Sequence, residues 1–167
     1  MQLFVHPRRF AYVNQVDWWH RGTLEQQQAL QDSLRPVWGT KYQQAMFNFA
    51  VRYKRPISQG GKGRSFVTWE IKETGGYLAI AGAVSVALSK NITQLEYMRP
   101  VVLHEYGHLW DNNNFITNED RNWFASFHNG QFNRETWAEA YKDWVLSDGA
   151  IWSGLTPILL RTPPPPT

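Results

Sequence analysis

The segment at residues 104–108, His-Glu-Tyr-Gly-His, constrains this chain more than any other feature. Two histidines four residues apart lie on one face of an α-helix, one turn from each other, so a helix would direct both imidazoles to the same side. Apolar residues flank the segment at 101–103 and 109–110, and they indicate a helix that is largely buried. We therefore predict a helix that has Pro100 in its first turn and runs to about Trp110.

Such a helix can present its two histidines to one metal ion. Bonds from imidazole nitrogen to zinc are about 2.0–2.1 Å long, which His104 and His108 can satisfy together. Glu105 lies beside that face and is placed to contact a metal-bound water. Zinc lowers the pKa of such a water to about 7, and a carboxylate can take its proton as the oxygen attacks a carbonyl group. The pattern predicts zinc (Zn²⁺) as cofactor and Glu105 as the catalytic general base.

Chance is a poor explanation for this pattern. The chain has five histidines and eight glutamates, and their random placement gives a His-Glu-x-x-His segment about 0.007 times. The alternative is a helix with two incidental histidines.

A catalytic zinc site needs a third protein ligand and leaves one position for water. Asn114 stands where an extended motif would place a third histidine, and Asp111 replaces its glycine, so that pattern is excluded. The remaining candidates are carboxylates and His128, and the best of them is Glu135. On a helix, Glu139 would share its face, so Glu135 can bind the metal while Glu139 accepts the free N–H of a ligand histidine. The alternative is a solvated acidic face.

At this point the sequence resembles a known family. A His-Glu-x-x-His helix followed by Glu-x-x-x-Glu on a later helix is similar to the gluzincins, the thermolysin-like clan of metallopeptidases. Residues 104–108 and 135–141 together look most like the family that includes the anthrax lethal factor catalytic domain and the proline-proline endopeptidases. The separation of 27 residues between His108 and Glu135 is more similar to the small ImmA/IrrE-type metallopeptidases, so the subfamily stays open.

The resemblance implies a zinc-dependent endopeptidase with an α+β, zincin-like fold. That fold would comprise a small mixed or antiparallel sheet with an N-terminal helix, then the active-site helix and a helical C-terminal lobe. In gluzincins an edge strand above the zinc pairs with the extended substrate, and this role would fall to Tyr77, Leu78 and Ala79. An ordinary interior strand is the alternative.

The resemblance also implies a tyrosine or histidine near the third ligand. Its side chain would donate a hydrogen bond to the oxyanion of the tetrahedral intermediate. His128 is the only residue of either type shortly before Glu135, which makes it a second candidate catalytic residue. An ordinary loop histidine is the alternative.

The remaining sequence predicts further local elements. Alternating apolar residues at 47–53 and 67–71 predict two strands, and the glycine-rich stretch at 59–63 predicts a turn that joins them into a hairpin. Short strands are expected at 77–80 and 84–88. Thr23 begins a capping box that predicts a helix to Arg35, and Asn133 is expected to cap a helix from residue 134 to 146. Residues 111–130 read as irregular.

Composition excludes several classes of protein. The net charge is +3 with scattered bases, which argues against a nucleic-acid partner. The absence of cysteine excludes disulfides, thiolate ligands and cysteine nucleophiles, including the cysteine that peptide deformylases need for their metal. The N-terminal residues lack a signal-peptide pattern, and the apolar run at 78–88 is too short to span a membrane. We therefore expect no membrane or nucleic-acid partner and, by default, a cytoplasmic location. A monomer is expected.

The predicted organisation is one metallopeptidase domain at residues 1–160, with lobes at about 1–111 and 112–160, followed by a proline-rich tail at 161–167. The expected substrate is a protein or peptide. The competing hypotheses are an inactive binding or structural protein that keeps the zinc site, and a metal-dependent hydrolase of non-peptide amides.

Overall fold

The computed structural model describes residues 16–20, 40–53, 67–72, 77, 79–82, 85–89 and 95–162. The predicted helix at 24–35, the predicted turn at 59–63, Leu78 and the prolines of the tail lie outside these described residues. No helix within the described ranges is both long enough and apolar enough to cross a membrane.

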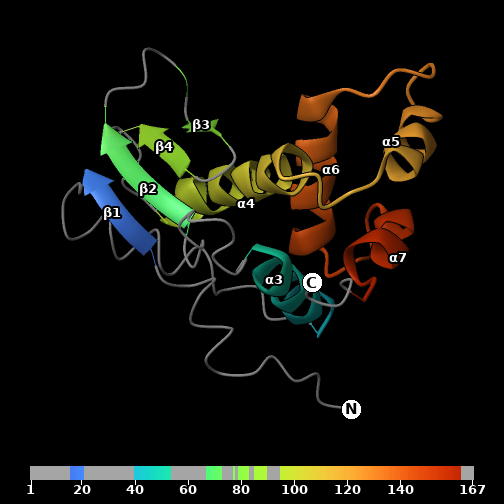
Figure 1. Cartoon of the computed structure of the whole chain (residues 1–167), viewed down its shortest axis with the longest axis horizontal. Helices are drawn as coiled ribbons and strands as arrows, with labels where there is room; N and C mark the ends of the chain where they lie inside the picture. The colour runs from blue at the N-terminus through green and yellow to red at the C-terminus, as the bar shows by residue number, and fades with distance from the viewer. Residues whose placement is uncertain are drawn as a thin grey trace, which may run out of the picture.

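The sheet has four strands in the order β1-β2-β4-β3. These strands are β1 (Val16–His20), β2 (Val67–Lys72), β3 (Ala79–Ala81) and β4 (Ser85–Ser89). β2 pairs in parallel with both β1 and β4, whereas β3 pairs antiparallel with β4 (Figure 1). The sheet is therefore mixed, as expected, and the predicted strands at 67–71, 77–80 and 84–88 are confirmed within two residues of each end.

The predicted strand at 47–53 is wrong, because these residues belong to helix α3 (Thr40–Tyr53). Tyr42, Ala45 and Phe49 are buried, and their spacing of three and four residues is that of one helical face. Phe49 packs edge-on against Tyr106, with ring centroids 5.1 Å apart. The alternation of apolar and polar residues at 47–53 is short, and the helical spacing becomes visible only when residues 42–49 are considered together. The expected hairpin is wrong for the same reason, since β2 pairs with β1 and β4 instead.

Helix α4 (Leu95–Asn112) carries the His-Glu-x-x-His segment. It begins five residues before Pro100, so the prediction of this proline in the first turn is wrong. Proline has no N–H to donate to the carbonyl four residues earlier, here that of Glu96. Met98 and Val102 are both buried and lie one turn apart, and their packing explains why the helix extends across the proline.

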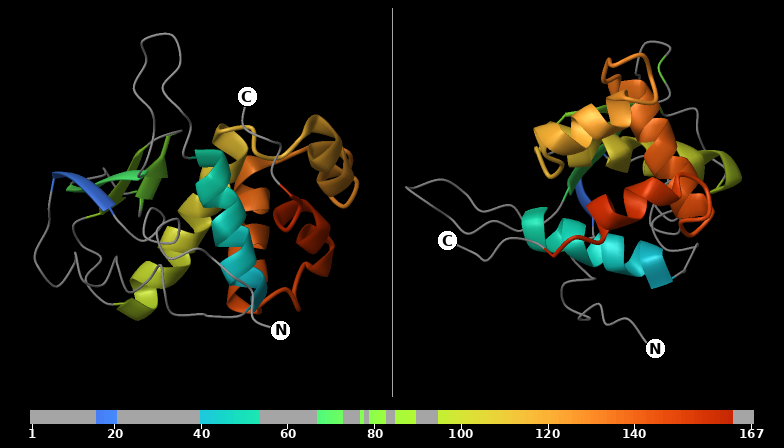
Figure 2. Two further views of the ribbon diagram at one scale, coloured as in Figure 1. Left: turned by 60° about the horizontal axis from the view of Figure 1, so that its bottom comes forward. Right: turned by 90° about the vertical axis from the view of Figure 1, so that its right-hand side faces the viewer.

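The C-terminal region is helical, with α5 (Asn118–Ala125), α6 (Arg134–Leu146), a single 3₁₀ turn η1 (Ser153–Leu155) and α7 (Thr156–Leu159). The bounds of α6 are those predicted, and the Asn133 side chain caps it by accepting from the Thr136 N–H. α5 corrects the expectation of irregular structure at 111–130. Figure 2 shows the sheet on one side of α4 and helices α6 and α7 on the other.

Asp120 joins α5 to the end of the chain. It completes a capping box with Thr117, and its carboxylate accepts hydrogen bonds from both terminal nitrogens of Arg161, at 3.2 and 2.7 Å. Partial burial opposes ionisation of Asp120, but the bonds from Arg161 and from the Thr117 backbone outweigh it and lower the pKa of this carboxyl below 3.8. The contact therefore stabilises the fold above about pH 4 and is lost as pH falls through the depressed pKa.

We predict that Asp120→Asn lowers the free energy of unfolding by about 1–3 kcal/mol at pH 7, because the amide cannot accept both charged hydrogen bonds. The difference between variant and wild type should shrink below pH 4, where Asp120 of the wild type becomes protonated. Denaturant unfolding at pH 7 and at several acidic pH values measures both effects. A difference that stays constant across this range would show that ionisation of Asp120 contributes nothing.

Candidate metal centre

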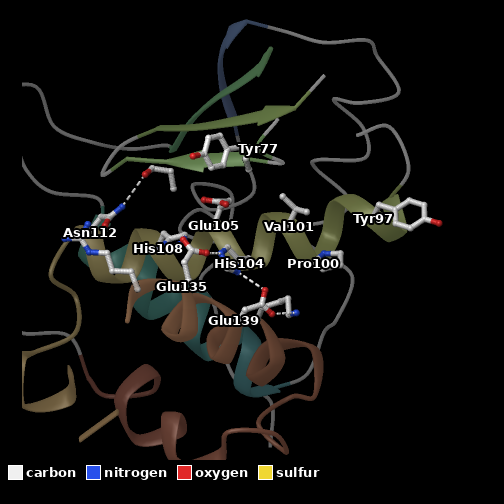
Figure 3. A pocket seen from close by; sticks show the side chains of 14 residues that line it. Tyr77, Tyr97, Pro100, Val101, His104, Glu105, His108, Asn112, Glu135 and Glu139 are labelled. Atoms are coloured by element: carbon white, nitrogen blue, oxygen red, sulfur yellow. Dashed lines mark hydrogen bonds and ion pairs between the residues drawn. The ribbon is translucent and has the colours of Figure 1, made fainter. Parts of the chain in front are cut away.

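Three side chains from two packed helices converge on one point. His104 and His108 project from α4, and Glu135 projects from the first turn of α6 (Figure 3). Each offers one ligand atom, and these atoms all lie within 4.8 Å of one another. The Glu135 carboxylate contacts both imidazoles, with one oxygen 3.0 Å from His104 Nε2 and the other 2.9 Å from His108 Nε2. The structure thus brings together the three residues predicted as ligands.

Glu139 lies one turn further along α6 and contacts the other side of His104. Its carboxylate oxygen is 3.0 Å from His104 Nδ1, which leaves Nε2 directed at the converging ligand atoms. Partial burial opposes ionisation of Glu139, but hydrogen bonding and charge from Lys142, followed by His104, lower its pKa below the ordinary value. A charged carboxylate on Nδ1 fixes the orientation of the imidazole and raises the basicity of Nε2.

The donor set fits zinc. Two imidazole nitrogens and one carboxylate are the three protein ligands of a common type of catalytic zinc site. In a tetrahedron with bonds of about 2.05 Å, neighbouring ligand atoms lie about 3.3 Å apart, and the three candidate ligand atoms all lie within 4.8 Å of one another. Burial lowers the pKa of His108, against the opposing effect of Glu135. His108 is thereby favoured in the neutral form, which is the form that binds a metal.

Glu105 is adjacent to the three candidate ligands but is more deeply buried than Glu135. It is only 5% exposed, and its Oε2 atom has no hydrogen-bond partner among the described residues. Burial, and secondarily the negative charge of Glu135, raises the pKa of Glu105 to about 7. A buried carboxylate oxygen without a protein partner is costly unless a water or a substrate group satisfies it. Glu105 therefore presents a buried carboxylate oxygen that a water or a substrate group could satisfy.

Gly107 explains how α6 comes close enough to contribute a ligand. A Cβ atom at this position would lie 2.7 Å from Ala138 Cα, so only glycine permits the observed approach of the two helices. The Trp137 indole N–H donates to the Gly107 carbonyl at 2.9 Å in the buried interface. Because Trp137 follows Glu135 by two residues, this contact also fixes the position of Glu135, the third candidate ligand, along α4.

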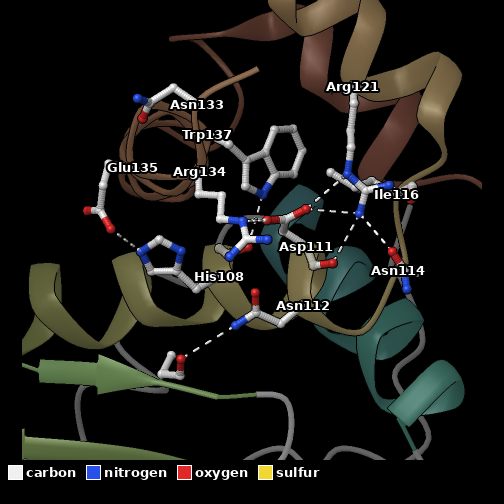
Figure 4. A network of polar contacts seen from close by, with 12 residues as sticks. His108, Asp111, Asn112, Asn114, Ile116, Arg121, Asn133, Arg134, Glu135 and Trp137 are labelled. Carbon is white, nitrogen blue, oxygen red and sulfur yellow. Dashed lines mark hydrogen bonds and ion pairs between the residues drawn. The ribbon is translucent and has the colours of Figure 1, made fainter. Parts of the chain in front are cut away.

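A polar network surrounds Asp111, one turn after His108 (Figure 4). Asp111 is 6% exposed and accepts from Arg121, whose Nε and terminal nitrogen lie 3.0 and 2.9 Å from Oδ1. Arg121 also donates to the Asp111 carbonyl at 3.0 Å. The network ties the end of α4 to α5, and Asp111 is neutralised by Arg121 and does not join the converging ligands.

The centre opens into a cavity of about 990 Å³ that is lined by α4, α6 and the region of β3. β3 is an edge strand of the sheet, and Asn112 holds its end by donating to the Gly82 carbonyl at 2.9 Å. Tyr77 and Ala79, two of the residues expected to contact substrate, line this cavity, and Tyr77 is 68% exposed. Leu78, the third, lies outside the described residues.

His128 is not brought to the centre and does not line its cavity. Its ring stacks on Trp152, with centroids 5.8 Å apart, and its Nδ1 is 3.2 Å from the Phe124 carbonyl. The structure therefore does not place this second candidate catalytic residue beside the predicted ligands. The aromatic packing at the end of α5 determines where this side chain points, and a count of histidines upstream of Glu135 does not reveal that.

Several cavity residues were not anticipated from the sequence, namely Tyr97, Pro100, Val101, Asn112, Arg134 and Lys142. For most of them, the helical spacing from the predicted site residues could have indicated a place in the cavity. Asn112 and Val101 lie four residues after His108 and three before His104, and Lys142 lies three after Glu139. Arg134 directly precedes the third ligand.

Comparisons of the chain with protein-family models, with curated proteins and with solved structures find no match.

Proposed function

We propose that this protein is a zinc-dependent endopeptidase of the gluzincin type, with a zincin-like fold. The observation that carries the proposal is the convergence of His104, His108 and Glu135 on one point, beside the buried Glu105, whose Oε2 atom has no hydrogen-bond partner among the described residues. Zinc bound there would act as a Lewis acid on a substrate carbonyl and would lower the pKa of a bound water to about 7.

Glu105 performs the proton transfers. Its carboxylate accepts the proton of the attacking water and then delivers it to the nitrogen of the leaving amine, so that the peptide bond is broken with no net change in protonation of the enzyme. A general base must be within hydrogen-bond reach of the proton that it takes, and the buried position of Glu105 beside the candidate ligands, with an Oε2 atom that has no partner among the described residues, supports this role.

The edge strand β3 supports an extended peptide as substrate. Ala79 and Ala81 line the cavity, and β3 is the last strand of the described sheet. Main-chain groups on a sheet edge can pair with an added strand. Asn112 fixes the end of β3 to α4, so the edge is held at a constant distance from the ligands. Residues at 77–79 would then contact the substrate backbone.

The test is cleavage of a peptide library by the zinc-loaded chain, with products identified by mass spectrometry. His104→Ala protein treated in the same way is the control for contaminating peptidases. Cleavage by the wild type alone, abolished by a chelator and restored by zinc, supports the proposal. Stoichiometric zinc without any turnover would favour the alternative, a binding or structural protein that retains the metal.

The contacts of Glu135 and Glu139 predict different effects on zinc affinity. Glu139→Gln should weaken zinc binding about 10–100-fold, because His104 loses the carboxylate that orients it. Glu135→Gln should weaken it more, since a ligand is removed. Glu119→Gln, an exposed change on α5 away from the cavity, should have no effect. Competition with a chromophoric chelator measures all three, and a larger loss for Glu139→Gln than for Glu135→Gln would reverse the assigned roles.

A further inference from the structure

The cavity has two chemically different ends, and the metal-binding residues lie between them. The lining residues of α4 run along one face of the helix, from Tyr97 through His104 and His108 to Asn112 (Figure 3). With a rise of 1.5 Å per residue, Tyr97 lies about 10 Å before His104 and Asn112 about 6 Å after His108. An extended peptide of about 3.3 Å per residue would reach both ends when bound across the centre.

The end near Asn112 carries a cation, Arg134, whose guanidinium group can still bind an anion. Arg134 lines the cavity and its side chain is 75% exposed. Within the described part of the chain, its ion pair is the long contact from Nε to Asp111 Oδ2, at 3.7 Å. Asp111 is already hydrogen-bonded by Arg121 at 3.0 and 2.9 Å, so Arg134 is not needed to neutralise it. The planar guanidinium group of arginine suits bidentate binding of a carboxylate.

The second basic residue of the cavity is engaged differently. Lys142 forms an ion pair with Glu139 and lies 3.4 Å from Asp143. Partial burial acts against its charged form, but the hydrogen bond and charge of Glu139 raise the pKa of Lys142 above its ordinary value. Lys142 therefore supports the residue that orients His104, which leaves Arg134 as the cavity cation available to a substrate among the described residues.

The opposite end is aromatic and apolar. Tyr97 is 64% exposed at the cavity, and Pro100 and Val101 follow it on the same face of α4. The exposed ring offers contact area to an apolar side chain at low entropic cost. No charged group of the cavity belongs to this stretch of α4, so the two ends would select side chains of different chemistry.

We infer that the substrate is a peptide with an acidic side chain on one side of the cleaved bond and an apolar or aromatic side chain on the other. Arg134 binds the acidic residue, within about two positions of the cleaved bond, and Tyr97 contacts the apolar residue, about three positions away on the opposite side. This inference rests on the proposed function for cleavage, but the recognition by Arg134 can be measured by binding alone.

The experiment uses end-blocked peptide libraries in which one position is fixed as glutamate, glutamine or lysine and the others are randomised. Cleavage is measured with the zinc-loaded chain, and binding is measured with zinc-loaded Glu105→Gln protein. Both measurements are repeated with the Arg134→Gln and Arg134→Glu substitutions. We expect binding and cleavage of the glutamate library about tenfold above the glutamine library, a ratio typical of one charge-assisted hydrogen-bonded contact. Arg134→Gln should abolish the preference, and Arg134→Glu should transfer it to the lysine library.

Two further variants complete the design. Lys41→Gln removes one positive charge from α3, outside the cavity, and should retain the preference for glutamate. Tyr97→Ala should reduce the preference for apolar residues on the opposite side of the cleaved bond. It should not change the preference for glutamate.

The outcomes separate this inference from the proposed function. Glutamate-selective binding without cleavage would support the role of Arg134 and overturn the peptidase proposal. Cleavage with equal use of glutamate and glutamine would support the peptidase proposal and overturn the role of Arg134. An unchanged preference for glutamate in Arg134→Glu would also overturn the role of Arg134. A failure both to bind and to cleave any library would overturn both.

Discussion

Replacement of Glu105 by glutamine is expected to leave zinc binding intact and to lower kcat/KM for peptide cleavage by about 10²–10⁴-fold, the usual contribution of a general base. The two side chains have nearly the same size, and Glu105 is outside the group that converges on the metal position. The amide, however, cannot accept the proton of the attacking water. Zinc analysis and steady-state kinetics on the same preparation measure both properties.

The matched control is Glu96→Gln, the same change in the first turn of the same helix at an exposed position outside the cavity. It should keep wild-type kinetics. Wild-type turnover by Glu105→Gln would show that another group serves as base, and loss of zinc from this variant would show that Glu105 is a ligand.

The second large effect is expected for Gly107→Ala. Alanine favours the helical state over glycine by about 1 kcal/mol, but here its Cβ would lie 2.7 Å from Ala138 Cα and 3.1 Å from Tyr141 Cβ. The nearest atom belongs to the backbone of α6, so the helices must separate. Overpacking of this kind typically costs about 1–3 kcal/mol of stability.

Separation of the helices also moves Glu135 away from the two histidines. Gly107→Ala should therefore bind zinc more weakly even under conditions where circular dichroism shows it to be folded. Denaturant unfolding and chelator competition test the two consequences separately. A variant with wild-type stability and wild-type zinc affinity would contradict the account of how α6 is positioned.

The parts of the molecule that follow from local signals were predictable. Asn133 caps α6 at the expected residue, because side-chain capping depends on neighbours in sequence. The spacing within the motif and within Glu-x-x-x-Glu also indicated that each pair shares one helix face, because both pairs lie on helices. The docking of α6 on α4, at Gly107 and Trp137, is what brings Glu135 to the two histidines and Glu139 to the far side of His104.

The errors arose where packing between distant segments decides the outcome. Residues 47–53 alternate like a strand, but burial of Tyr42, Ala45 and Phe49 against α4 and the C-terminal helices selects a helix. The orientation of His128 depends on Trp152, which lies 24 residues later. Arg134 and Asn112 have no motif of their own, and only the docking of α6 on α4 and of β3 on α4 places them in the cavity.

The central claim is that His104, His108 and Glu135 hold one zinc ion. Crystals of the zinc-loaded protein, with diffraction data collected on both sides of the zinc absorption edge, locate the ion directly. We expect one anomalous peak per chain, at about 2.0–2.2 Å from His104 Nε2, His108 Nε2 and a carboxylate oxygen of Glu135, with Glu139 on Nδ1 of His104 and Glu105 outside the coordination sphere. Zinc bound instead by Asp111, Asp120 or Glu139, or no peak between α4 and α6, would contradict the claim.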